Sequence, residues 1–85
     1  MQFDGALIKE QGISFAIVVV KPTLLSSTQR EETRMSFSKY FPGVPIVLMV
    51  QDGRGTPTYH GRQDIVKFLA NINPSRIPFK RYTAN

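Results

Sequence analysis

Two runs of apolar residues dominate the hydrophobic pattern of this chain, Ile13–Val20 and Ile46–Val50. Both are rich in β-branched residues, and apolar side chains occupy nearly every position instead of every second one. Such a strand is buried on both faces, as central strands are when helices cover both sides of a sheet. The pattern therefore predicts two central strands of an α/β sheet.

Helical spacing is present in two further segments. The first predicts an amphipathic helix that begins near Gly61 and ends before Pro74, because its apolar residues fall at i, i+3, i+4 and i+7: Ile65, Phe68, Leu69 and Ile72. The second runs from Thr28 to Tyr40, begins with capping-box residues, and carries an apolar stripe at Thr33, Phe37, Tyr40 and Phe41. Both helices are expected to pack on the sheet.

The opening segment has two interpretations. A short helix over Phe3–Gln11 is the first, with Asp4 at its start and Gly12 in the left-handed position that ends many helices. A strand over Gly5–Gln11, paired as a hairpin with the following apolar run, is the alternative.

A third strand is predicted over Thr56–His60, after a turn at Asp52–Gly55. Pro57 has no N–H for a ladder, so either this strand lies at a sheet edge or Pro57 directs its missing donor outward. The predicted order is α-β-α-β-β-α: an α/β domain over residues 1–74 whose small mixed sheet has three or four strands, with helices packed on it. Residues 75–85 then form a basic and aromatic C-terminal tail.

The order of elements resembles the thioredoxin-like fold, shortened by one strand–helix unit in the middle. The resemblance is carried by Gly43, Val44 and Pro45 before an apolar strand, and by Tyr59–Arg62 before an amphipathic helix. It implies a cis-proline at Pro45 beside a ligand cleft. The chain has no cysteine, and disulfide exchange needs a thiolate, so thiol–disulfide oxidoreductase activity is excluded.

Length and charge narrow the functional classes. A chain of 85 residues without cysteine is a single domain with no disulfide and no thiolate metal site. The net charge of +5 arises in residues 54–85, since residues 1–53 are balanced. This asymmetry can attract phosphate backbones, and the alternative nucleic-acid interface would use Arg54, Arg62, Arg76, Lys80 and Arg81.

The tail has three interpretations, one of which is contact with a protein partner. Ile77, Phe79 and Tyr82 can pack back on the sheet, even as an edge strand, while Lys80 and Arg81 stay solvated. Alternatively, the interleaved cations and aromatic rings form a segment that binds single-stranded nucleic acid.

Candidate ligand-binding residues gather around the expected cleft: Lys21, Ser26, Ser27, Pro45 and His60. Backbone N–H groups at the start of a helix can hold an anion, and Lys21 adds charge. His60 is the only histidine and has no carboxylate or nucleophile near it in sequence. The carboxylates suit helix caps and solvated faces, so neither a metal site nor a cofactor is predicted.

These patterns favour a non-catalytic interaction module of thioredoxin-like type, which binds a protein partner or forms a homo-oligomer. Nucleic-acid binding is one alternative, and an enzyme of unknown type at the Pro45 and His60 region is another. No signal peptide or membrane-spanning run is present in the sequence, so a cytoplasmic protein without membrane association is expected.

Overall fold

The computed structural model describes residues 2–10 and 12–83 of the chain. Its elements follow in the order β1 (Gln2–Glu10), β2 (Ile13–Val19), α1 (Pro22–Leu25), α2 (Arg30–Ser36), the 3-10 helix η1 (Phe37–Lys39), β3 (Ile46–Gln51), β4 (Pro57–His60), α3 (Gln63–Leu69), the 3-10 helix η2 (Pro74–Arg76) and β5 (Lys80–Thr83). No helix within these ranges is long and apolar enough to cross a membrane.

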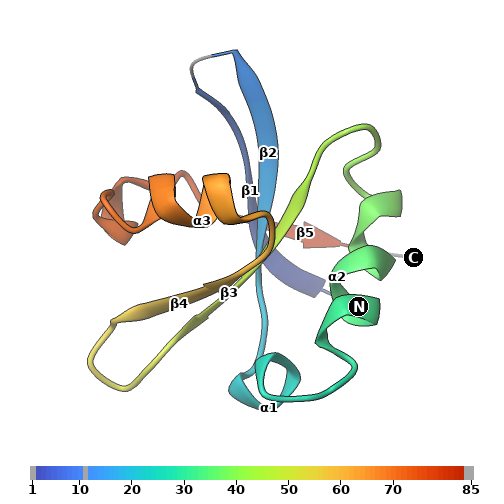
Figure 1. Cartoon of the computed structure of the whole chain (residues 1–85), viewed down its shortest axis with the longest axis vertical. Coiled ribbons are helices and arrows are strands. Elements are labelled where there is room, and N and C mark those ends of the chain that lie inside the picture. The colour runs from blue at the N-terminus through green and yellow to red at the C-terminus, as the bar shows by residue number, and fades with distance from the viewer. Residues whose placement is uncertain (1, 11, 84–85) are drawn as a thin grey trace.

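The strands form one five-stranded mixed sheet with the order β4-β3-β2-β1-β5. Within the described residues, β2 and β3 pair in parallel, from Ala16 opposite Ile46 to Val19 opposite Met49, and the other strand pairs are antiparallel. Helix α3 lies on one side of the sheet, and α1 and α2 lie on the other (Figure 1). We call these sides the α3 face and the α2 face.

Each face of the sheet has its own hydrophobic core. The core of the α2 face contains Phe3, Ala16, Val18, Phe37, Phe41, Ile46 and Leu48. The core of the α3 face contains Ala6, Phe15, Ile17, Val47, Met49, Ile65, Leu69 and Ile77. Residues of β2 and β3 alternate between the two cores, which confirms that both apolar runs form central strands covered on both sides.

The predicted helix over Phe3–Gln11 is wrong for the residues described, because residues 2–10 form strand β1; Gln11 lies outside them. This strand pairs with β2 from Gly5 opposite Val18 to Glu10 opposite Ile13, as the hairpin alternative predicted. Gly12 has a φ of 80°. A left-handed glycine suits a hairpin turn as well as a helix end, so the local signal did not separate the two structures.

The expected order α-β-α-β-β-α with three or four strands is therefore wrong. The chain begins with a β-hairpin and adds a fifth strand at its end. The fifth strand, Lys80–Thr83, pairs with Gln2–Gly5. Before it, Ile77 is buried and Phe79 is half-buried, and within it Tyr82 is half-buried. The physical reason is that β1 offers a hydrogen-bonding edge, which the C-terminal segment partly covers.

The predicted edge position of the third strand is confirmed. Strand β4 is the outermost strand beside β3, and Pro57 is its first residue. The last helix is shorter than predicted, since α3 ends at Leu69, but Ile65 and Leu69 face the core as expected. The helix expected over residues 28–40 is divided into α2 and η1, and Phe37 and Phe41 bury their rings.

Candidate functional site

The expected cleft between Pro45 and the segment after β2 does not form. Pro45 precedes β3, where its carbonyl oxygen accepts a hydrogen bond of 2.9 Å from the amide of Ala16. Lys21 follows the other end of β2, beyond the pair of Val19 with Met49. Lys21 and Pro45 therefore lie at opposite ends of the parallel ladder. The described residues contain no cis peptide bond, so Val44–Pro45 is trans, unlike the cis-proline that the resemblance implied.

Ser26 and Ser27 have local partners. The hydroxyl of Ser26 donates to the carbonyl oxygens of Pro22 and Thr23, at 3.3 Å each. The hydroxyl of Ser27 accepts from the amide of Gln29 at 3.0 Å. These bonds stabilise the connection between α1 and α2, but neither helix has a side-chain cap at its N-terminus, so the capping box expected before the second helix does not form.

His60 meets a carboxylate that the sequence did not place near it. Its Nε2 lies 2.7 Å from Oε2 of Glu31, which comes from α2. Arg34 donates to the other carboxylate oxygen of Glu31 and also to the carbonyl oxygen of Ile46, the latter at 3.1 Å. The hydrogen bonds of the described residues bring no hydroxyl or amine to His60, so the cluster connects α2 to β3 and β4 and holds no nucleophile.

The Glu31 cluster predicts a pH effect on stability. Hydrogen bonds from Arg34 and then His60 lower the pKa of Glu31 from 4.5 to about 2. Because the pKa of Glu31 is lower in the folded state, its ionised carboxylate stabilises the fold at pH values above the unfolded pKa. This stabilisation is lost as the pH falls from 4.5 towards 2. Glu31→Gln should lower the free energy of unfolding by less than about 1 kcal/mol at neutral pH, because the Glu31 side chain is 54% exposed. At the acidic end of this range the substitution should have almost no effect on stability.

Urea unfolding of wild type and Glu31→Gln at neutral pH and near the folded pKa measures this difference. Glu32→Gln is the matched control, since Glu32 is the next residue of α2 and is exposed, with no ion pair among the described residues. If the stability difference between wild type and Glu31→Gln stayed constant across this pH range, the pKa of Glu31 would not be lowered by its partners in the folded state.

The five cations of the nucleic-acid alternative are dispersed. Arg54 lies in the turn between β3 and β4, at the opposite edge of the sheet from Lys80 and Arg81 in β5. Lys80 and Arg81 are consecutive in a strand and so point to opposite faces. Arg62 is paired with Asp64, and Arg81 with Asp4, both at 2.7 Å. The arrangement does not bring these cations together as one basic surface.

An incompletely covered sheet edge is present on β1. Strand β1 extends from Gln2 to Glu10, but β5 pairs only with Gln2–Gly5. Among the described residues, no strand pairs with the outer edge of Ala6–Glu10, which we call the free edge. Alternate residues of a strand direct their N–H and C=O groups to each side. The free edge therefore offers unpaired backbone donors and acceptors over about 17 Å.

The chain itself cannot continue β5 along the free edge. Pro78 has no N–H, and the amide of Phe79 donates to the carbonyl oxygen of Ile77 at 2.8 Å. This tight turn directs residues 77–79 towards the α3 face, where Ile77 and Phe79 pack in the core. The ladder opposite β1 consequently stops at the pair of Gly5 with Lys80.

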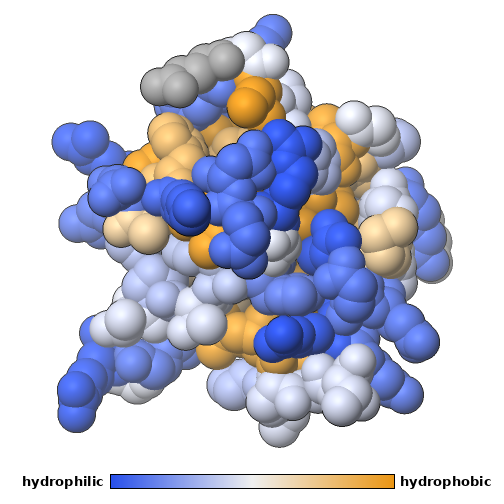
Figure 2. All heavy atoms as spheres, viewed as in Figure 1, coloured by the Kyte–Doolittle hydropathy of each residue, from blue (hydrophilic) through white to orange (hydrophobic). Residues whose placement is uncertain are grey.

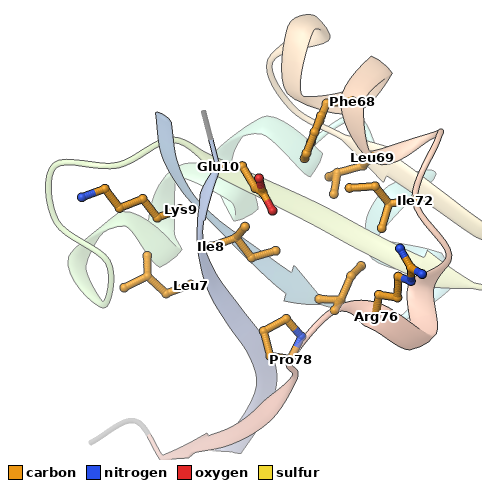
Figure 3. A pocket seen from close by; sticks show the side chains of 10 residues that line it. Leu7, Ile8, Lys9, Glu10, Phe68, Leu69, Ile72, Arg76 and Pro78 are labelled. Carbon is orange, nitrogen blue, oxygen red and sulfur yellow. The ribbon is translucent and has the colours of Figure 1, made fainter. Parts of the chain in front are cut away.

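An apolar groove of about 370 Å³ lies beside the free edge, between β1 and the segment that follows α3. Ile8 and Glu10 point towards this groove, whereas Leu7 and Lys9 point away from it (Figure 3). The groove is lined by Leu7, Ile8, Lys9, Glu10, Phe68, Leu69, Ile72, Arg76, Ile77 and Pro78. A second hollow of about 230 Å³ shares Glu10 and Phe68 with it and extends to Ile13.

The surroundings of the free edge are apolar with charged groups at the rim. Leu7 is 56% exposed and Ile13 is 40% exposed, and hydrophobic atoms are visible on the surface near the β1–β2 hairpin (Figure 2). Glu10 and Arg76 are exposed at the groove, and within the described residues no ion pair shorter than 4.0 Å joins them. Both charged groups therefore remain available to a ligand.

Sequence reasoning missed the residues of this groove, although one signal was present: the hairpin alternative for residues 5–11 would have placed Ile8 and Glu10 on the same side of a strand. No protein family, curated protein sequence or solved structure matches the chain.

Proposed function

We propose that this protein is a non-catalytic interaction module that binds a segment of a partner protein in extended conformation. The segment adds as a strand to the free edge of β1, between Ala6 and Glu10. The observation that carries the proposal is the coincidence of unpaired backbone groups with an apolar groove beside them. Strand addition uses these two features: backbone hydrogen bonds supply affinity, and pockets for alternate side chains supply specificity.

The edge strand β4 and the free edge of β1 differ in a way that supports this proposal. The edge strand β4 has only four residues and begins with Pro57, and short edges that carry proline are poor templates for pairing. The free edge of β1 contains no proline, and Leu7 and Ile8 provide apolar contacts beside it. An extended segment is therefore expected to prefer the free edge of β1 to β4.

A peptide selection with mapping by NMR tests the proposal. The protein is used to select binders from a random twelve-residue library displayed on phage, and the amide resonances of the protein are recorded with each selected peptide. The largest shifts are expected at Ala6–Glu10 and Ile77, and the amides of Thr58–His60 in β4 serve as the internal control. Failure to select any peptide, or shifts centred on α2 or β4, would overturn the proposal.

Backbone methylation separates strand addition from simple groove binding. A selected peptide is resynthesised twice, with N-methyl groups on its odd or on its even residues. Only alternate N–H groups of an added strand face β1, so one methylated peptide should lose binding and the other should keep it. Equal binding by both methylated peptides would show that no backbone ladder forms.

A further inference from the structure

The flanks of the free edge specify which kind of segment fits there. We infer, on the basis of the proposed function, that the partner segment alternates acidic and apolar side chains, with an acidic–apolar–acidic sequence opposite Lys9, Ile8 and Leu7. The charged groups around the free edge differ between the two faces of the sheet.

On the α2 face, the free edge is flanked by lysines. Lys9 belongs to this face, because its neighbours Ile8 and Glu10 point into the groove on the other face (Figure 3). Lys80 lies opposite Gly5 and shares this face with Tyr82, over whose ring its Nζ lies, 5.3 Å from the centroid. A side chain opposite Lys9 forms a direct cross-strand pair with it, and a side chain opposite Leu7 lies next to Lys80 along the added strand. Acidic residues complement both positions.

On the α3 face, the side chain opposite Ile8 enters the groove. Phe68, Leu69, Ile72 and Ile77 surround that position, so an apolar side chain loses its contact with water there. Because successive side chains of a strand point to opposite faces, an apolar residue in the groove has its two neighbours beside the lysines. The alternation of acidic and apolar residues follows from this geometry.

A second copy of the chain fits the same edge less well. Antiparallel pairing of two β1 strands about Ile8 would place Lys9 of one copy opposite Leu7 of the other. The incoming Lys9 would then lie beside Lys80, and two such like-charged pairs would form across the symmetric contact. Like charges that follow one another along the same side of β1 and on the same face repel each other, so a heterologous acidic segment is the better occupant.

Synthetic peptides test the inference directly. The probe has the sequence Thr-Val-Glu-Val-Glu-Val-Thr with blocked ends, and it is compared with a version carrying lysine for glutamate and with the scrambled sequence Val-Val-Thr-Glu-Glu-Thr-Val. At low ionic strength, titration followed by NMR is expected to show about tenfold tighter binding of the alternating acidic peptide than of either comparison peptide. Its shifts should centre on Ile8–Glu10.

Charge reversal on the protein provides the reciprocal test. The double variant Lys9→Glu with Lys80→Glu should lose about tenfold in affinity for the acidic peptide and should prefer the lysine peptide. Arg30→Glu with Lys39→Glu, which reverses two exposed charges away from the groove, should leave the affinity unchanged.

The outcomes distinguish the inference from the proposed function. Two outcomes would overturn the inference and leave strand addition intact. In the first, the acidic and lysine peptides bind the free edge equally well. In the second, library peptides that bind at Ala6–Glu10 contain no acidic residues. A dimer in sedimentation equilibrium that Lys9→Glu strengthens would identify a second copy as the occupant and overturn the inference. Failure of every peptide to shift residues of the free edge would remove both proposals.

Discussion

Phe3→Ala is expected to lower the free energy of unfolding by about 3–5 kcal/mol, the usual cost of removing a buried aromatic side chain. Phe3 is 7% exposed, and its ring centroid lies 5.1 Å from that of Phe37 and 5.3 Å from that of Tyr82. The ring thus joins β1, η1 and β5, which are distant in sequence. A domain of this length has a total stability of about 4–13 kcal/mol, so the variant should lose a large fraction of its stability.

Leu7→Ala is the matched control for Phe3→Ala. Leu7 belongs to the same strand and loses a similar apolar group, but it is 56% exposed, so its cost is expected to stay below about 1 kcal/mol. Urea unfolding followed by circular dichroism measures both variants. Equal losses of stability would show that the aromatic cluster around Phe3 does not contribute as the structure indicates.

The central part of the fold could be predicted because its signals are local and strong. Ile13–Val20 and Ile46–Val50 are short, rich in β-branched residues and apolar at almost every position, which is typical of a strand covered on both faces. The last helix was recognisable from the spacing of Ile65 and Leu69. Pro57 marked an edge strand, because a proline cannot donate to a ladder.

The ends of the chain could not be predicted because long-range pairing decides their structure. The segment Phe3–Gln11 contains signals for a helix and for a hairpin, and the ladder with β2 favours the strand. Pairing of β5 with Gln2–Gly5 connects residues about as far apart as the chain allows. The bond of 2.7 Å between Arg81 and Asp4 has the same origin, and no short window of sequence contains both partners.

The candidate site could not be predicted from the sequence for a related reason. The groove is formed by β1, α3 and the residues around Pro78, three segments that meet only after the sheet has formed. The sequence also did not indicate the partner of His60, because Glu31 lies on α2 and reaches β4 across the α2 face. The expected cleft failed because it required Pro45 and Lys21 at the same end of two strands, and the parallel register separates them.

Incomplete coverage of β1 connects the fold to the proposed function. Strand β5 covers about half of β1. The turn at Pro78, which precedes β5, keeps residues 77–79 in the core of the α3 face instead of along β1. Burial of Ile77 and Phe79 thereby stabilises the domain and leaves Ala6–Glu10 unpaired. The packing of these residues and the availability of the free edge are consequences of one local turn.

Gly61→Ala is expected to lower the free energy of unfolding by about 1–3 kcal/mol, the range for overpacking a tight site. Gly61 connects β4 to α3, and a Cβ atom there would lie 3.0 Å from Cγ2 of Val47 and 3.1 Å from the carbonyl oxygen of Ile46. Because these contacts include backbone of the central strand β3, relief requires the β4–α3 connection to move. Such movement would displace Phe68 and Leu69, which line the groove, so peptide binding should weaken together with stability.

Gly53→Ala provides the control for this substitution. Gly53 lies in the turn between β3 and β4, where an added Cβ has no heavy atom within 4 Å and the backbone does not require a positive φ. Alanine restricts the unfolded chain, so Gly53→Ala should be neutral or stabilise the protein by up to about 1 kcal/mol. Thermal unfolding separates the two variants, since 1 kcal/mol corresponds to about 4–8 °C for a domain of this size. If both alanine variants shifted the midpoint by the same amount, the close approach of Gly61 to β3 would not be a constraint on the fold.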